Sequence, residues 1–134
     1  MKSIVFLSVE DVLLLHGDTM SHESGLSGIR DHGLLDAAVA MPRQQFGGQY
    51  LHQDLSAMAA AYLYHLAQNH PLHDGIKRVA VMAAYVFLDA NGQELDASPT
   101  ELETVTRHVA SSEMKKDDLI DWMREHIRPR SRRH

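Results

Sequence analysis

The chain contains no cysteine among its 134 residues. Disulfide bonds and thiolate metal sites are therefore excluded. It also has no apolar run long enough to span a membrane, because the stretch 4–9 is too short and no small-residue cleavage site follows it. Repeats, low-complexity segments and an internal linker are absent as well. We therefore expect one domain, no membrane association and a cytoplasmic protein.

Positive charge is scarce except near the C-terminus. The formal net charge is −5, yet residues 124–134 hold five arginines and a single glutamate. The remainder of the chain is correspondingly acidic, which argues against broad contact with duplex DNA. We expect residues 1–127 to form the domain and residues 128–134 to form a flexible basic tail, without direct binding to nucleic acid.

Apolar periodicity and capping residues predict an all-α fold of five to six helices. Ser8 and Ser98 are each followed three residues later by an acid, which is typical of helix N-caps. The segment 75–90 is apolar on almost every side after its first residues, which predicts a helix at the centre of a bundle. A Gly-Gly pair in segment 44–52 indicates a small hairpin or a flexible loop. The expected helices cover residues 12–16, 33–41, 55–69, 75–90, 99–110 and 117–127.

Residues 70–78 read His-Pro-Leu-His-Asp-Gly-Ile-Lys-Arg and are the most informative stretch of the chain. They form a polar segment that leads directly into the apolar helix. A helix N-terminus presents unpaired N–H groups and a partial positive charge, which attract phosphate. A histidine and a carboxylate in the same stretch can supply a base and a metal ligand. The stretch therefore predicts phosphate chemistry.

This stretch resembles the Fic motif, whose usual form is His-x-Phe-x-(Asp/Glu)-(Gly/Ala)-Asn-x-Arg. Segments 6–12 and 28–38 are similar to signatures of the death-on-curing (Doc) branch of that family. Lys77, at a position where other Fic proteins usually have glycine, and the lack of a second arginine soon after Arg78 also point to Doc. The resemblance covers about residues 4–125 and implies a compact Fic-type helical bundle around a buried central helix.

The Doc resemblance implies a toxin that transfers the terminal phosphate of ATP to a threonine or serine hydroxyl of translation factor Tu. It further implies a Phd-like antitoxin as partner and Mg²⁺ as cofactor. Two alternatives stay open. Other Fic proteins transfer a nucleotide monophosphate to a different protein, and a copy with impaired chemistry would serve as a binding module for an antitoxin or a ligand.

The resemblance also assigns roles by position. His70 is the general base, since an imidazole titrates near neutrality. Asp74 is the Mg²⁺ ligand, although a carboxylate there also suits a plain N-cap. Gly75 lets the backbone approach phosphate, and the N–H groups of residues 75–78 bind it. Arg78 grips phosphate oxygens and stabilises charge during transfer. Lys77 either contacts phosphate or lies in solvent.

Two positions depart from the family pattern. Leu72 replaces phenylalanine and preserves apolar character. Ile76 replaces the asparagine whose amide contacts phosphate, and isoleucine donates no hydrogen bond. Loss of one such contact costs about 1.5–3 kcal/mol. The chain is therefore expected to be attenuated, either as a degenerate or repurposed family member or as a weakened variant.

Three further interpretations concern other candidate residues. His73 with His70 does not make a zinc site, because no third ligand is evident. Arg30 and Asp31 either approach the nucleotide or the target or, as we favour, fix a long loop through an ion pair or a cap. Segment 19–23 resembles the inhibitory helix of some Fic proteins too weakly to predict built-in inhibition, so a separate antitoxin is expected to restrain the enzyme.

Overall fold

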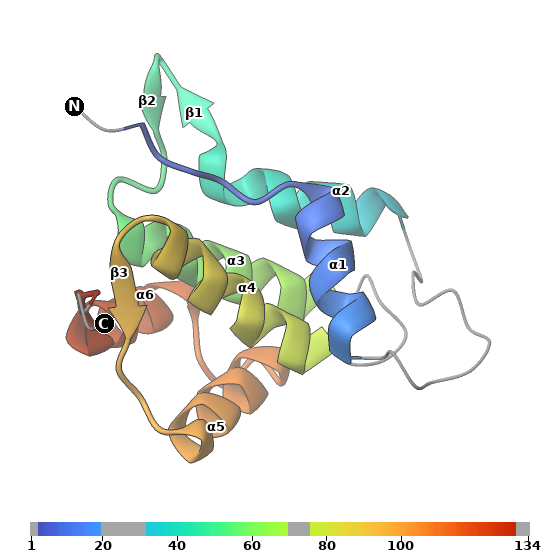
Figure 1. Cartoon of the computed structure of the whole chain (residues 1–134), viewed down its shortest axis with the longest axis vertical. Coiled ribbons are helices and arrows are strands. Elements are labelled where there is room, and N and C mark those ends of the chain that lie inside the picture. Colours follow the sequence, from blue (N-terminus) through green and yellow to red (C-terminus); the bar gives the residue numbers. More distant parts are fainter. Residues whose placement is uncertain (1–2, 20–31, 70–75, 131–134) are drawn as a thin grey trace.

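The computed structural model describes residues 3–19, 32–69 and 76–130 (Figure 1). Over these ranges the chain is mainly helical, as predicted. None of the described helices is long and apolar enough to cross a bilayer. The helices are α1 (Val9–Thr19), α2 (His32–Ala40), α3 (Leu55–Asn69), α4 (Ile76–Ala90), α5 (Pro99–Ala110) and α6 (Lys116–His126), and a 3-10 turn, η1 (Met41–Arg43), follows α2.

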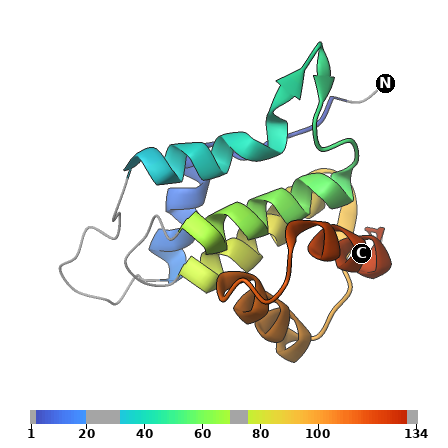
Figure 2. The same cartoon turned by 180° about the vertical axis from the view of Figure 1, so that it is seen from behind.

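Helix α3 lies at the centre of the bundle and runs antiparallel to α4 (Figures 1 and 2). It packs against α2, η1, α4, α5 and α6, and its residues 57–63 are all buried. The expectation that the helix after the motif would be buried all round is corrected here, since α4 exposes a strip that includes Tyr85 and Asp89. Alanines at five of the nine buried positions in α3 let neighbouring helices approach closely.

Two predicted helix starts are confirmed in atomic detail. The Ser8 N–H donates to the Asp11 carboxylate over 2.9 Å, and the Asp11 N–H donates to Ser8 Oγ over 3.1 Å. Ser98 and Glu101 make the same reciprocal pair before α5. These capping boxes satisfy N–H groups that have no partner inside the helix.

Two small antiparallel sheets complete the described fold. The predicted hairpin is present, with β1 (Gln45–Phe46) paired to β2 (Gln49–Tyr50). It projects from the end of the bundle at which α3 begins, while α3 ends and α4 begins at the opposite end (Figure 1). The second sheet pairs β3 (Gln93–Leu95) with β4 (Ile127–Pro129) and was not predicted. Its strands are short and lie far apart in the sequence, so no local pattern indicates their pairing.

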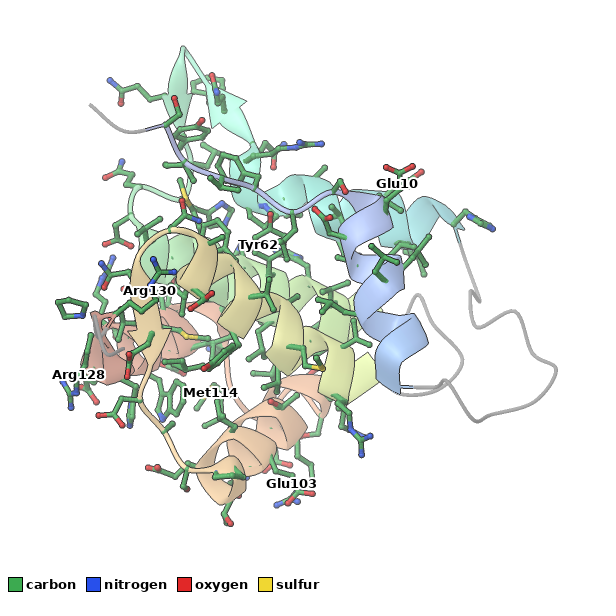
Figure 3. The ribbon with its side chains drawn as sticks, viewed as in Figure 1. Glu10, Tyr62, Glu103, Met114, Arg128 and Arg130 are labelled. Carbon is green, nitrogen blue, oxygen red and sulfur yellow. The ribbon has the colours of Figure 1, made fainter. Side chains whose placement is uncertain are left out.

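The start of the expected C-terminal tail is part of this second sheet. Arg128 bonds to the Asp96 carboxylate over 2.7 Å, and the Arg130 N–H donates to the Gly92 carbonyl over 2.9 Å. Both arginines lie at the end of the molecule where β3 and β4 pair (Figure 3). Residues 128–130 are therefore attached to the folded body, and residues 131–134 lie outside the described ranges.

Candidate functional site at the junction of α3 and α4

The first turn of α4 places two cations beside the start of a helix. Lys77 and Arg78 are exposed, whereas Val79 and Ala80 are fully buried. The first turn contains no acidic residue. The buried residues hold the helix against the core, and both cations stay exposed at its start. A helix start with this charge favours an anionic ligand.

Several predicted site residues lie outside the described part of the chain. These are His70, Leu72, His73, Asp74 and Gly75, together with Arg30, Asp31 and Glu23. Ile76 is the first residue of α4. The structure therefore positions residues 76–78 of the motif, and the base, the metal ligand and the binding of phosphate stay predictions from the sequence.

The end of α3, which leads into the motif, is bound to three other elements by polar side chains. The Lys116 ammonium group in α6 lies 2.9 Å from His65 Nε2, and because it can only donate, the imidazole accepts. Gln68 Nε2 donates to the Val109 carbonyl of α5. Asn69 Nδ2 donates to the Leu34 carbonyl of α2 over 3.3 Å. No local sequence signal marks these residues, because their partners lie far away in the sequence and meet them only in the folded chain.

Three basic side chains have lowered pKa values: His65 of α3, Lys116 of α6 and His52, which precedes α3. Burial, followed by the positive charges of Lys116 and His52, lowers the pKa of His65 from 6.5 to about 4. Burial and then Lys116 also lower the pKa of His52, which is 6% exposed. The pKa of Lys116 is lowered by burial as well. At neutral pH both imidazoles are therefore uncharged, and His65 is available as an acceptor.

The described residues include no group of three histidine, aspartate or glutamate side chains that could hold a metal ion. The expected Mg²⁺ ligand, Asp74, is not among them. The described residues at this helix start, an exposed lysine and arginine, suit an anionic group rather than a metal ion.

A mostly helical domain with two exposed cations at the start of a helix is suited to an anionic ligand. Comparison with known proteins makes this specific: residues 6–88 match the model of the Fic/DOC family. The chain belongs to this family.

Two curated relatives cover nearly the whole chain. It is 39% identical over 116 residues to "Toxin Doc" of Mycolicibacterium smegmatis, which covers 85% of this chain and 87% of that protein. It is 30% identical over 118 residues to "Protein kinase doc" of Escherichia phage P1, which covers 88% of this chain and 92% of that protein. Both names support the Doc branch within the family.

Proposed function

We propose that the protein is the toxin of a toxin–antitoxin pair and acts as a protein kinase of the Doc type. The observation that carries this proposal is the likeness, over almost the full length, to one protein named as a toxin and another named as a protein kinase. The exposed cations at the start of α4 support it, since they suit a polyphosphate.

In the proposed reaction, ATP phosphorylates a threonine or serine hydroxyl of translation factor Tu. The hydroxyl oxygen attacks the terminal phosphorus, the bond to the bridging oxygen breaks, and ADP leaves. His70 accepts the hydroxyl proton, and Arg78 stabilises the charge on the transferred group. Asp74 would hold Mg²⁺, which neutralises charge on the phosphates when bound. Gly75, Ile76 and Lys77 complete the phosphate-binding turn.

The proposed target places the activity in the cytoplasm and requires restraint in the host. A Phd-like antitoxin is the proposed partner that supplies this restraint. The antitoxin would be tested by co-purification and by relief of growth arrest when both genes are expressed. A toxin whose growth arrest no neighbouring gene relieves would contradict this part of the proposal.

Ile76 is expected to lower the rate of transfer, because its side chain cannot donate a hydrogen bond to phosphate. Restoring the family residue with Ile76→Asn should raise the rate about tenfold to a hundredfold, which corresponds to about 1.5–3 kcal/mol. The measurement is labelling of translation factor Tu with γ-labelled ATP and magnesium. His70→Ala in the same background is the control and should abolish labelling. No labelling with the asparagine variant would contradict the kinase proposal.

The same assay separates transfer of phosphate from transfer of a nucleotide. ATP labelled at the α-phosphate marks the target only if a nucleotide monophosphate is transferred. Label retained from the α-phosphate, and none from the γ-phosphate, would favour the nucleotidyltransferase alternative with another protein as target.

Ile76 itself favours one second candidate, a binding module that has lost its chemistry. Calorimetry with Mg-ATP distinguishes the two functions. A catalytic Doc-type protein binds the nucleotide at the start of α4, and Arg78→Gln weakens that binding. No detectable heat with either the natural chain or Ile76→Asn would favour the module.

A further inference from the structure

The last turn of α3 is the segment from which the proposed catalytic base extends. Asn69 is the final residue of α3, and His70 follows it directly. Consecutive Cα atoms are about 3.8 Å apart, so the position and direction of residue 69 restrict where an imidazole on residue 70 can lie. The groups that hold residues 68 and 69 are therefore relevant to catalysis, provided that the proposed function is correct.

Gln68 binds the turn that ends α5. Its Nε2 donates to the Val109 carbonyl and lies 3.1 Å from Ser112 Oγ. The Val109 carbonyl also accepts from the Ser112 N–H over 3.1 Å, and Ser112 has a φ of 67°, the left-handed conformation that closes a helix end. The carbonyls of the last helical turn lack partners within the helix. The Gln68 amide therefore supplies a second hydrogen bond to the Val109 carbonyl, which has two lone pairs.

Asn69 binds a different neighbour. Its Nδ2 donates to the Leu34 carbonyl in α2, over 3.3 Å. Both amides thus bind backbone carbonyls, whose positions are set by buried residues of their own helices, Leu35 in α2 and Val109 in α5. The end of α3 is held to α2 and to α5 at two successive residues.

We propose that Gln68 and Asn69 are positioning residues that hold the end of α3 so that His70 meets the target hydroxyl. A general base acts only within hydrogen-bonding distance, about 2.6–3.2 Å, of the proton it removes. A displacement of about 1 Å can reduce the rate by about a hundredfold. Neither residue contacts the reacting atoms in this scheme, and each acts through the placement of His70.

The test removes each donor with a side chain of similar size, by Gln68→Met and Asn69→Leu. The matched control is Arg124→Met, which removes the ion pair to Asp54, 3.3 Å long, at the opposite end of α3. Each variant is compared by kcat, KM for ATP, the pH profile of transfer and the melting temperature, in the Ile76→Asn background if the natural chain is slow.

We expect kcat to fall about tenfold to a hundredfold in both amide variants while KM for ATP changes by less than about twofold. The acidic limb of the pH profile, which reports the base, should shift as well. The control should keep its kcat within about twofold, and its melting temperature should change little, because an exposed ion pair contributes little to stability. Equal kcat values in the amide variants and the control would overturn the proposal.

A second readout needs no enzymatic activity. The ring nitrogen signals of His70, assigned by their loss in His70→Gln, are titrated by NMR in each variant. Both amide variants should change the midpoint, because a displaced ring meets different neighbours, and the control should leave it unchanged. An unchanged midpoint in the amide variants overturns the positioning role. If the midpoint shifts in the amide variants but no protein, including the control, transfers phosphate, the positioning role stands and only the proposed function is contradicted.

Discussion

At the scale of the residue, the contact between His65 and Lys116 depends on an uncharged imidazole. The Lys116 ammonium group donates to His65 Nε2, so a proton on that nitrogen would remove the acceptor and bring two positive charges together. His52 is close enough to lower the pKa of His65 further. Acidic conditions should therefore weaken the packing of α3 against α6.

The sign of this effect follows from the two states of His65. Its pKa is about 4 in the folded protein and about 6.5 when unfolded. Between these values the unfolded chain binds the proton, so the free energy of unfolding falls as the pH drops from about 6.5 to about 4, by on the order of 2 kcal/mol after allowance for solvent screening. His65→Gln keeps an acceptor without titrating and should flatten this dependence. Denaturant unfolding of both proteins at about pH 7 and about pH 5 measures the effect. An equal loss of unfolding free energy between the two pH values in the natural chain and in the variant would contradict it.

The hydroxyl group of Tyr62 contributes to stability separately from its aromatic ring. Its hydroxyl accepts from the Leu7 N–H over 2.8 Å in the buried core, and burial raises the pKa of Tyr62 to about 12 (Figure 3). Tyr62→Phe keeps the contact with the Phe87 ring, 5.1 Å away, but leaves that N–H without a partner. We expect the free energy of unfolding to fall by about 1–3 kcal/mol. Tyr85→Phe, at a 48% exposed position, should change it little in the same denaturation experiment.

At the scale of the element, local chemistry sets most of the helix boundaries. Helix α3 spans the predicted residues 55–69, and the capping boxes begin α1 and α5 where the sequence indicates. Gly92, with a φ of 83°, follows the end of α4 at residue 90. Each signal lies within a few residues of the boundary it marks, so it depends only on local sequence.

The capping box of α5 provides a test at this scale. Ser98→Ala removes the oxygen that accepts from the Glu101 N–H over 3.1 Å. We expect a loss of about 1 kcal/mol in the free energy of unfolding, measured by urea denaturation. Thr100→Ala, at an exposed position in the same turn, is the control and should stay within about 0.5 kcal/mol. A loss no larger than that of the control would show that the cap contributes nothing.

At the scale of the whole molecule, both terminal segments are attached to the region that follows α4. The Asn91 side chain accepts from the Val5 N–H over 2.9 Å and donates to the Val5 carbonyl over 2.8 Å. On the C-terminal side, Arg130 bonds to the Gly92 carbonyl and pairs with Asp89 at 3.5 Å. The N-terminal and C-terminal segments thus both bind to residues 89–92, at the end of α4.

Truncation separates the contribution of β4 from that of the remaining residues. A chain that ends after His126 loses the pairing of β4 with β3 and the contacts of Arg128 and Arg130. It should lose on the order of 2 kcal/mol of unfolding free energy, mostly through backbone hydrogen bonds, since exposed ion pairs contribute little. A chain that ends after Arg130 should match the full chain in thermal denaturation. Equal stability of both truncated chains would contradict a structural role for β4.

Helix type, capping and the motif at the junction of α3 and α4 could be read from the order of residues alone, because each depends on neighbours within a turn or two. The sheet between β3 and β4 could not, and neither could the amide contacts of Gln68 and Asn69. Their partners lie tens of residues away, and only packing brings them together. The central position of α3 was likewise decided by tertiary contacts, since apolar content favoured α4 while the small side chains of α3 let more neighbours approach.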